Sequence, residues 1–391
     1  MEANSSENSS LSLILNTTGS GNIVNSTSTQ PRPIGYYGEI RELLWKIVPP
    51  ILILCGTTGN TLTIIVTMRM KKLSSTAVYL LILAVSDTTI LLCGPLRNWI
   101  SFAWGKDIRR LSDAACKVQL YLTYASLHFS SWLLVAVTME RTISVVFPHK
   151  VKVNCTRRNA CLIILALFVF TFGVDAVVPA TQSLKGYGGK SCAPTTEAYL
   201  NFRDDVWQWI DFCMAFAFPF IFLVIGNTVM IVKLYKSRLK RKQMSGNSRQ
   251  KDANIGRKES AVYVLMVALC IIFLLTMTPV TVYQIYAPYR RIEILALYKI
   301  DKDAGWTDYQ FFILQHTIVN LVAYTNAAFN FVLYVFTGTK FRTELIRLFR
   351  SSRAQRVFDA SGNRLIKKTS EEMKTKTTGI SSTSQSKESR Y

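Results

Sequence analysis

Seven apolar stretches, each long enough to cross a membrane as a helix, constrain this chain more than any other feature of its sequence. A helix of about 20 apolar residues, rising about 1.5 Å per residue, spans the roughly 30 Å hydrocarbon core of a bilayer. A helix also satisfies its own backbone polar groups where water is absent. We therefore expect an all-α membrane protein, a seven-transmembrane helix bundle. The predicted spans are about 46–68, 76–97, 113–146, 159–180, 205–235, 257–287 and 308–336.

The distribution of basic residues predicts the orientation of the bundle. The chain has 46 lysines and arginines against 24 acidic residues, a net charge of +22. The basic residues gather near Arg69, near Lys150, from Lys233 to Lys258 and in the C-terminal tail. The first three of these segments are every second connection between spans, and the tail follows the last span. By the positive-inside rule these segments are cytosolic. We expect a multi-pass plasma-membrane protein with an extracellular N-terminus and a cytosolic C-terminus, whose basic charge contacts membrane lipid rather than nucleic acid.

The N-terminal tail and the cysteines carry the marks of an extracellular side. Residues 1–45 are rich in Asn, Ser and Thr, which predicts a disordered tail, and its four N-x-Ser/Thr tripeptides predict glycosylation. The acceptor residues are Asn4, Asn8, Asn16 and Asn25. Of the eight cysteines, only Cys116 and Cys192 lie on segments predicted to face the oxidising compartment. We expect these two to form a disulfide.

Short motifs fall on these spans in a characteristic order. They are Gly59-Asn60, Leu83-Ala84-Val85-Ser86-Asp87, Glu140-Arg141-Thr142 with Pro148, Pro219, Phe273 with Pro279, Asn326, and Asn330-Phe331-Val332-Leu333-Tyr334. Together they resemble the rhodopsin-like (class A) G-protein-coupled receptors over about residues 45–350. The resemblance implies a bundle at 46–337, an amphipathic membrane-surface helix at 338–350 and a disordered cytosolic tail at 351–391.

Asp87 is an acid in the middle of a span. The resemblance implies that it binds an allosteric sodium ion. It implies no required cofactor. Oxygen ligands suit a hard cation, and the family places such ligands at Asn60, Ser130, Asn326 and Asn330. A structural acid held neutral by hydrogen bonds is the alternative reading of Asp87.

The family's G-protein switch maps onto two of the motifs. The switch residues are Glu140, Arg141, Thr142, Asn330 and Tyr334. In this reading Glu140 holds Arg141 until activation releases it; a simpler reading has Arg141 only reaching lipid headgroups.

The helix hinges that the family implies are Phe273, Met277, Pro219 and Pro279. Two of the motifs depart from the usual pattern, because Met277 replaces a tryptophan and Phe331 replaces a proline. In these departures the chain is similar to invertebrate FMRFamide-type neuropeptide receptors.

Two ligand classes are disfavoured by single positions. The seventh span has no lysine for a retinal Schiff base, and Thr123 stands where amine receptors carry an aspartate. Aromatic and charged residues at the outer ends of the spans favour a peptide, with Arg97 binding a carboxylate or carbonyl and Asp175 or Asp211 a cationic side chain. The expected pocket residues are Arg97, Trp104, Thr123, Tyr124, Asp211, Tyr283, Gln284, His316 and Asn320, although tryptophans also form interfacial belts.

The predicted function is therefore that of a non-enzymatic receptor. An extracellular neuropeptide would activate a heterotrimeric G protein, while receptor kinases and arrestin act on the Ser/Thr-rich C-terminal tail. A chemosensory receptor for a small molecule is the alternative on the same fold. A membrane transporter is more remote, because the sequence shows no internal repeat.

Overall fold

The computed structural model describes residues 35–70, 73–184, 192–244, 249–337 and 341–348. At residues 234, 238, 240–244, 249–266, 269 and 332–337 it describes the backbone alone. The chain divides into two compact units, residues 1–339 and 340–391. The glycosylation sites and the Ser/Thr-rich tail lie outside the described residues, and in the second unit a helix covers 341–348.

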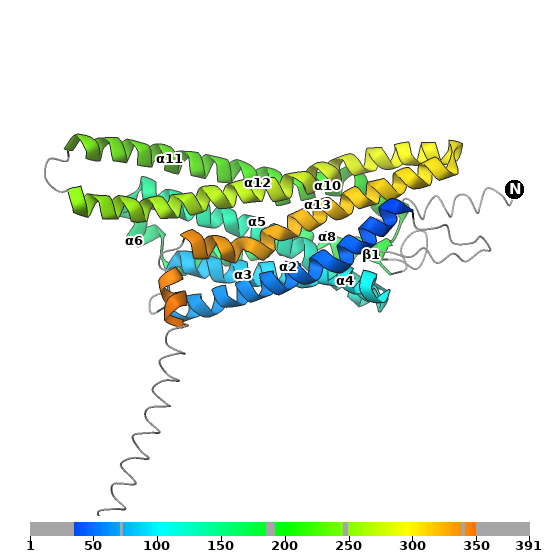
Figure 1. The fold of residues 1–391 in the computed structure, drawn as a ribbon, viewed down its shortest axis with the longest axis horizontal. Coiled ribbons are helices and arrows are strands. Elements are labelled where there is room, and N and C mark those ends of the chain that lie inside the picture. Colours follow the sequence, from blue (N-terminus) through cyan, green and yellow to red (C-terminus); the bar gives the residue numbers. More distant parts are fainter. Residues whose placement is uncertain (1–34, 71–72, 185–191, 245–248, 338–340, 349–391) are drawn as a thin grey trace, which may run out of the picture. The chain divides into compact units, whose positions relative to one another are not determined.

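The first unit is almost entirely helical (Figure 1). Its long helices and helix runs are α2 (Tyr36–Arg69), α3 (Ser75–Cys93) with α4 (Pro95–Trp104), α5 (Asp113–Val146), α7 (Arg157–Asp175) with α8 (Val177–Thr181), α9 (Glu197–Phe202) through α10 (Gln208–Phe212) to α11 (Phe218–Met244), α12 (Arg249–Ile300) and α13 (Lys302–Thr337). The short elements are η1 (Ile108–Arg110), η2 (Pro148–Lys150), α6 (Val151–Asn154), the antiparallel pair β1 (Gln182–Ser183) and β2 (Ala193–Pro194), and the π-helical turns η3 (Arg203–Trp207) and η4 (Cys213–Ala217).

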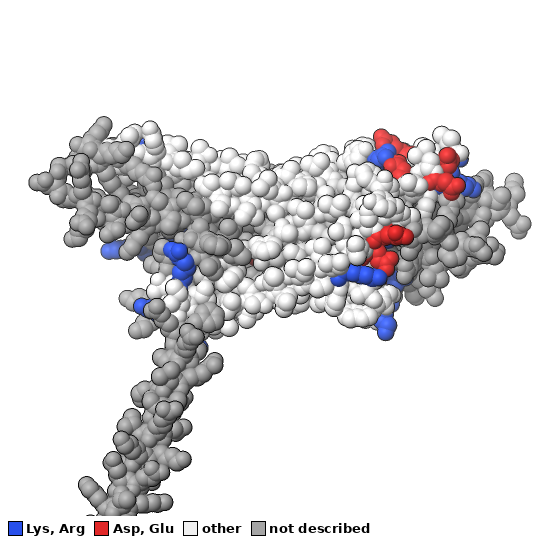
Figure 2. Space-filling view, in the orientation of Figure 1, with Lys and Arg blue, Asp and Glu red and all other residues white. Residues whose placement is uncertain are grey.

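The helices form a seven-helix bundle. Six runs within the described residues are long and apolar enough to cross a membrane, and α13 packs along α12 and α2 as the seventh helix. Figure 2 shows a broad band without acidic or basic side chains between charged residues at the two ends of this face. Such a band is what a lipid core requires. We call the end that carries α4 and the β1–β2 pair the disulfide end, and the end that carries α6 the α6 end (Figure 1).

Three helices extend further than the sequence predicts. The predicted first span starts near residue 46, but α2 begins at Tyr36, so part of the expected N-terminal tail is helical. The predicted sixth span ends near residue 287, but α12 continues to Ile300 and α13 begins at Lys302, so the expected connection is helical too. Hydropathy finds only the lipid-facing part of a helix, whereas these extensions are held by contacts between helices.

Side-chain caps explain where several helices begin. The hydroxyl of Ser74 accepts a hydrogen bond from Ala77 N at the start of α3, and Ser112 does the same for Ala115 N at the start of α5. Thr156 caps α7 through Asn159 N. Each cap satisfies a backbone N–H that has no partner within its helix.

Two glycines, Gly59 and Gly226, set how closely helices approach. A Cβ on Gly59 would lie 2.8 Å from Phe331 Cβ, so the bulky residue that replaces the family's proline fits against α2 only because position 59 has no side chain. A Cβ on Gly226 would lie 2.9 Å from Thr138 Cγ2. The packing of α13 on α2, and of α11 on α5, therefore depends on these positions.

The predicted hinges lie on buried, irregular helix. Pro219 is the second residue of α11, which follows the π-helical turn η4 directly, and Pro279 lies inside α12. Phe273 and Met277 are almost completely buried, and the ring of Phe273 stacks on Phe216 with 6.2 Å between centroids. Prolines and π-turns both interrupt the regular helical hydrogen bonds and are common causes of bends.

Candidate functional site

The expected disulfide between Cys116 and Cys192 is confirmed, and it ties α5 to the segment that leads into β2. Asp113, at the first turn of the same helix, accepts hydrogen bonds from Ser183 Oγ at 2.7 Å and from Leu184 N at 2.8 Å. The β1–β2 pair is therefore attached to α5 by a covalent bond and by hydrogen bonds. These attachments position it at the disulfide end of the bundle.

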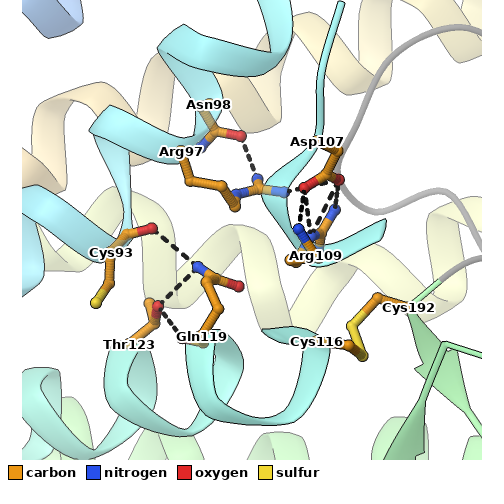
Figure 3. Close-up of polar contacts among 9 residues, drawn as sticks. All are labelled: Cys93, Arg97, Asn98, Asp107, Arg109, Cys116, Gln119, Thr123 and Cys192. Carbon is orange, nitrogen blue, oxygen red and sulfur yellow. Dashed lines mark hydrogen bonds and ion pairs between the residues drawn. A yellow bond between two sulfur atoms is a disulfide. The ribbon is translucent and has the colours of Figure 1, made fainter. Parts of the chain in front are cut away.

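Arg97 lies in a buried polar cluster between α4 and η1 (Figure 3). Its guanidinium donates to Asn98 Oδ1 and, at 3.4 Å, to Asp107 Oδ2. Arg109 donates to the same carboxylate, with Nη2 at 2.8 Å from Oδ2. Burial alone would raise the pKa of Asp107, but the hydrogen bonds and charge of Arg109 and the charge of Arg97 outweigh it and lower that pKa to about 2. Asp107 is thus an ionised carboxylate shared by two arginines.

Thr123, at the position of the amine-receptor aspartate, is engaged with its own helix. Its hydroxyl donates to Gln119 O at 2.8 Å and accepts from Gln119 Nε2, which also bonds Cys93 O (Figure 3). Tyr124 beside it packs edge to face on Trp207. Thr123 and Tyr124 therefore present hydroxyl and aromatic groups at the position where amine receptors carry an acid.

Several other predicted pocket residues come together on α12 and α13. Tyr283 donates to Phe312 O at 3.0 Å, and its ring centroid lies 5.3 Å from that of His316. Asn320 Nδ2 donates to His316 O at 2.7 Å. Gln284, on the same helix as Tyr283, is half-buried.

Trp104 does not join the group on α12 and α13. It packs on Trp99 near the end of α4, and 59% of its surface is exposed. That location is typical of an aromatic side chain at a membrane interface rather than of one that lines a pocket.

Asp211 forms a buried triad with a histidine and a second acid. Its Oδ1 lies 3.0 Å from His128 Nε2, while His128 Nδ1 lies 2.9 Å from Asp175 Oδ2. His128 and Asp175 have no exposed surface, and Asp211 is 4% exposed. An ionised carboxylate only accepts hydrogen bonds, so an imidazolium that donates from both nitrogens satisfies both acids. The triad joins α5, α7 and α10, and it occupies the two acids that the sequence suggests for a cationic ligand.

Three of the predicted sodium ligands meet in the centre of the bundle. Ser130 Oγ donates to Asp87 Oδ1 at 2.7 Å, and Asn330 Nδ2 donates to Asp87 Oδ2 at 2.7 Å. Asn330 Oδ1 is buried and has no hydrogen-bond partner among the described residues. Asn60 instead donates to Ala327 O at 3.3 Å, and Asn326 has no hydrogen bond within the described part of the chain. A carboxylate beside an unpartnered amide oxygen fits the ligand preference of a hard cation.

The predicted switch lies at the α6 end. Glu140 Oε1 accepts a hydrogen bond from Thr76 Oγ1 at 2.6 Å, and Thr142 Oγ1 donates to Thr138 O and to Gly226 O, at 2.8 and 3.2 Å. These bonds tie the end of α5 to α3 and α11. The side chain of Tyr334 lies outside the described residues, and the roles of Arg141 and Asn330 in a switch stay predictions.

Residues 59–334 match the protein family described as "7 transmembrane receptor (rhodopsin family)". The chain belongs to this family. The receptor is 25% identical to human "G-protein coupled receptor 65" over 247 residues, which are 62% of this chain and 68% of the human one. It is 22% identical to "Cysteinyl leukotriene receptor 1" of Sus scrofa over 311 residues, 78% of this chain and 84% of the pig one. It is therefore a membrane receptor of a non-enzymatic family, as the sequence motifs predict.

Two polar groupings of the receptor escape sequence reasoning. The first is the triad of His128, Asp175 and Asp211. The histidines of the sequence have no metal-ligand spacing, so no motif singles out His128. Ionisable residues inside membrane spans usually pair with one another, however, and this rule is the signal that could have found the triad. Arg41 and Arg291 lie on helix extensions that hydropathy assigns to a tail and a loop. These two arginines are recognised as helical residues only when the ends of α2 and α12 are taken from the packing of the helices, because the spans that hydropathy predicts are too short there.

Proposed function

We propose that this receptor binds an extracellular peptide at its disulfide end and activates a heterotrimeric G protein from its α6 end. The observation that carries the proposal is the contact of Tyr283 on α12 with His316 on α13. The buried Arg97 and the pair of Tyr124 with Trp207 add polar and aromatic groups to the same half of the bundle as the disulfide. A disulfide persists on the oxidising side of a membrane, which supports an extracellular disulfide end and N-terminus. Aromatic surfaces combined with a few fixed charges are typical of peptide anchors.

The geometry gives less support to a small cationic ligand. Thr123 takes the place of the amine-binding aspartate, and Asp175 and Asp211 are both engaged by His128. A monoamine would therefore have no available carboxylate among these side chains. The names of the two relatives describe what those proteins are and do not identify a ligand here. A small-molecule chemosensory receptor stays the second candidate, because a buried pocket can also serve an uncharged ligand.

The proposed output is a helix-in-groove contact at the α6 end. Opening of α5, α11 and α12 at that end would admit a helix of the G protein. The ties of Glu140 to Thr76 and of Thr142 to Gly226 are bonds that would have to change in such an opening. Receptor kinases and arrestin are proposed partners of the C-terminal tail.

A sodium ion at Asp87 is proposed as an allosteric ligand. Sodium should raise the midpoint of thermal unfolding of the purified receptor relative to the same concentration of choline, because it binds the folded state only. The Asp87→Asn variant should show no difference between the two salts, measured by the fluorescence of a thiol-reactive dye. A sodium effect that survives in Asp87→Asn would place the ion elsewhere.

The test of the proposed function is a screen in cells. Cells that express the full chain with a promiscuous G protein are exposed to a library of neuropeptides, FMRFamide-like amidated peptides included, and intracellular calcium is recorded. We expect a response at nanomolar peptide that is lost in Arg141→Ala at equal surface expression. Silence to all peptides with a response to small organic molecules would favour the chemosensory alternative.

A further inference from the structure

The α5–α7 connection, residues 147–158, carries basic residues and no acidic one. Its four cations are Lys150, Lys152, Arg157 and Arg158, and all four side chains are exposed. None of them forms an ion pair with another described residue. The connection is therefore a patch of positive charge that its own residues do not balance, at the α6 end of the bundle (Figure 1).

Hydrogen bonds from two helices hold the backbone of this connection. Ser75 Oγ of α3 donates to Cys155 O at 3.2 Å. Asn159 Nδ2 of α7 donates to Val153 O at 3.0 Å and to Asn154 O at 3.1 Å. The patch is thus a formed part of the fold, and its basic side chains extend from a fixed backbone.

Two apolar side chains are exposed on the same connection. Val153 is 70% exposed and Phe147 is 45% exposed. The ammonium group of Lys150 lies 5.5 Å from the ring centroid of Phe147. Exposed apolar side chains next to cations are typical of segments that lie in a membrane interface, where the apolar groups enter the acyl region and the cations meet the phosphates.

The connection lies where two membrane helices leave the hydrocarbon core. It begins directly after α5 ends at Val146, and α7 begins at Arg157. The lipid-facing surface of α7 starts within about two turns of that arginine, with the exposed Leu162 and Leu165. Arg157 and Arg158 also occupy the first turn of α7, where the helix dipole is positive and favours a nearby anion. The cations therefore lie at the level of the lipid headgroups.

We propose that the α5–α7 connection is a docking surface for anionic phospholipids of the cytosolic leaflet. Its four cations bind the headgroups, while Phe147 and Val153 enter the layer beneath them. A zwitterionic headgroup offers no net negative charge to these cations, whereas an anionic leaflet attracts each of them. This inference goes beyond peptide recognition and depends only on the α6 end being cytosolic.

A G protein is the other class of partner that approaches the α6 end. The membrane is favoured because α5 and α7, the two helices that flank the connection, continue directly into the hydrocarbon core. The connection therefore stays at the headgroups whether or not a G protein is bound.

The test measures whether anionic lipid covers Val153. The Val153→Cys variant of the full chain is placed in nanodiscs of phosphatidylcholine with or without phosphatidylserine. Alkylation by an uncharged, water-soluble maleimide is followed by tandem mass spectrometry, which separates position 153 from Cys155. We expect phosphatidylserine to slow alkylation at position 153 by about tenfold, because several cations near an anionic surface each strengthen the attachment.

A double variant in the same background tests the role of charge. Lys150→Gln with Lys152→Gln should reduce the effect of phosphatidylserine to about twofold or less. The matched control is Lys233→Gln with Lys236→Gln, which removes two exposed lysines of α11 from the same end of the bundle. The control should keep the full effect, because its lysines are not part of the connection.

Arg157→Gln with Arg158→Gln is a second test variant, so the result does not depend on the folding of the first, and it should lose the effect in the same way. Equal alkylation rates with and without phosphatidylserine would overturn the proposal. An effect that disappears equally in the α11 control would overturn it too, because the lipid would then respond to the total charge of this end. Protection of position 153 by a purified G protein, with none from phosphatidylserine, would assign the connection to a protein contact instead.

Discussion

Replacing His128 by alanine is expected to destabilise the folded receptor by about 3–5 kcal/mol, the cost of breaking a buried ion pair from one side. The substitution leaves Asp175 and Asp211 facing each other in the bundle without the donor that now lies 2.9 and 3.0 Å from them. Carboxylates in the interior of a membrane protein need such a partner. The measurement is the midpoint of thermal unfolding in detergent, together with the amount of receptor at the cell surface.

Two controls separate the triad from ordinary packing. Tyr121→Phe removes one neutral hydrogen bond, to Phe172 O at 2.9 Å, between α5 and α7, two of the three helices that the triad joins, and should cost about 1 kcal/mol. Replacing His128, Asp175 and Asp211 together by leucine removes all the charges at once and should restore most of the stability. If His128→Ala were no more harmful than Tyr121→Phe, the triad would not be an important element of stability.

Removing the disulfide by changing Cys116 and Cys192 to serine is expected to cost about 2–5 kcal/mol and to lower surface expression severely. The bond joins residues 76 positions apart. Closing so long a loop lowers the conformational entropy of the unfolded chain, and this stabilises the folded state relative to it. It also attaches the β1–β2 pair to α5, at the end of the bundle that carries the proposed ligand site. We therefore expect the small amount of receptor that reaches the surface to respond to agonist peptide with reduced potency.

The matched control for the disulfide is a free cysteine of the membrane part. Cys161 of α7 is exposed and unbonded, and Cys161→Ser should leave expression and potency unchanged. Treatment of the wild type with a reducing agent should reproduce the effect of the double variant. Normal expression and potency of the double variant would show that the hydrogen bonds of Asp113 hold the β1–β2 pair without the covalent bond.

Much of the fold follows from the sequence because lipid imposes a simple rule on it. A span of apolar residues must become a helix, and the order of Asp87, Arg141 and Pro279 along the spans identifies the family. The ends of α2 and α12 do not follow from the sequence, because the segments near Arg41 and Arg291 are polar enough to resemble a tail and a loop. Only contact with neighbouring helices makes them helical.

The candidate site follows from the sequence less completely. The pairing of Asp87 with Ser130 and Asn330 agrees with the family's pattern. The triad around His128 does not follow, because its members are 47 and 83 residues apart and meet only through the packing of three helices. Asp211 is therefore a structural residue as well as a predicted pocket residue, and this second role is visible only in three dimensions.

We propose that this receptor converts peptide binding at its disulfide end into G-protein activation at its α6 end. The most direct measurement is the rate of guanine-nucleotide exchange on a purified heterotrimeric G protein with the receptor in lipid nanodiscs, with and without the most potent peptide of the screen. We predict that the peptide accelerates exchange for the wild type and that Arg141→Ala, which binds the same peptide, does not. A peptide that binds with high affinity but leaves the exchange rate unchanged across the G-protein subtypes would contradict the proposed coupling.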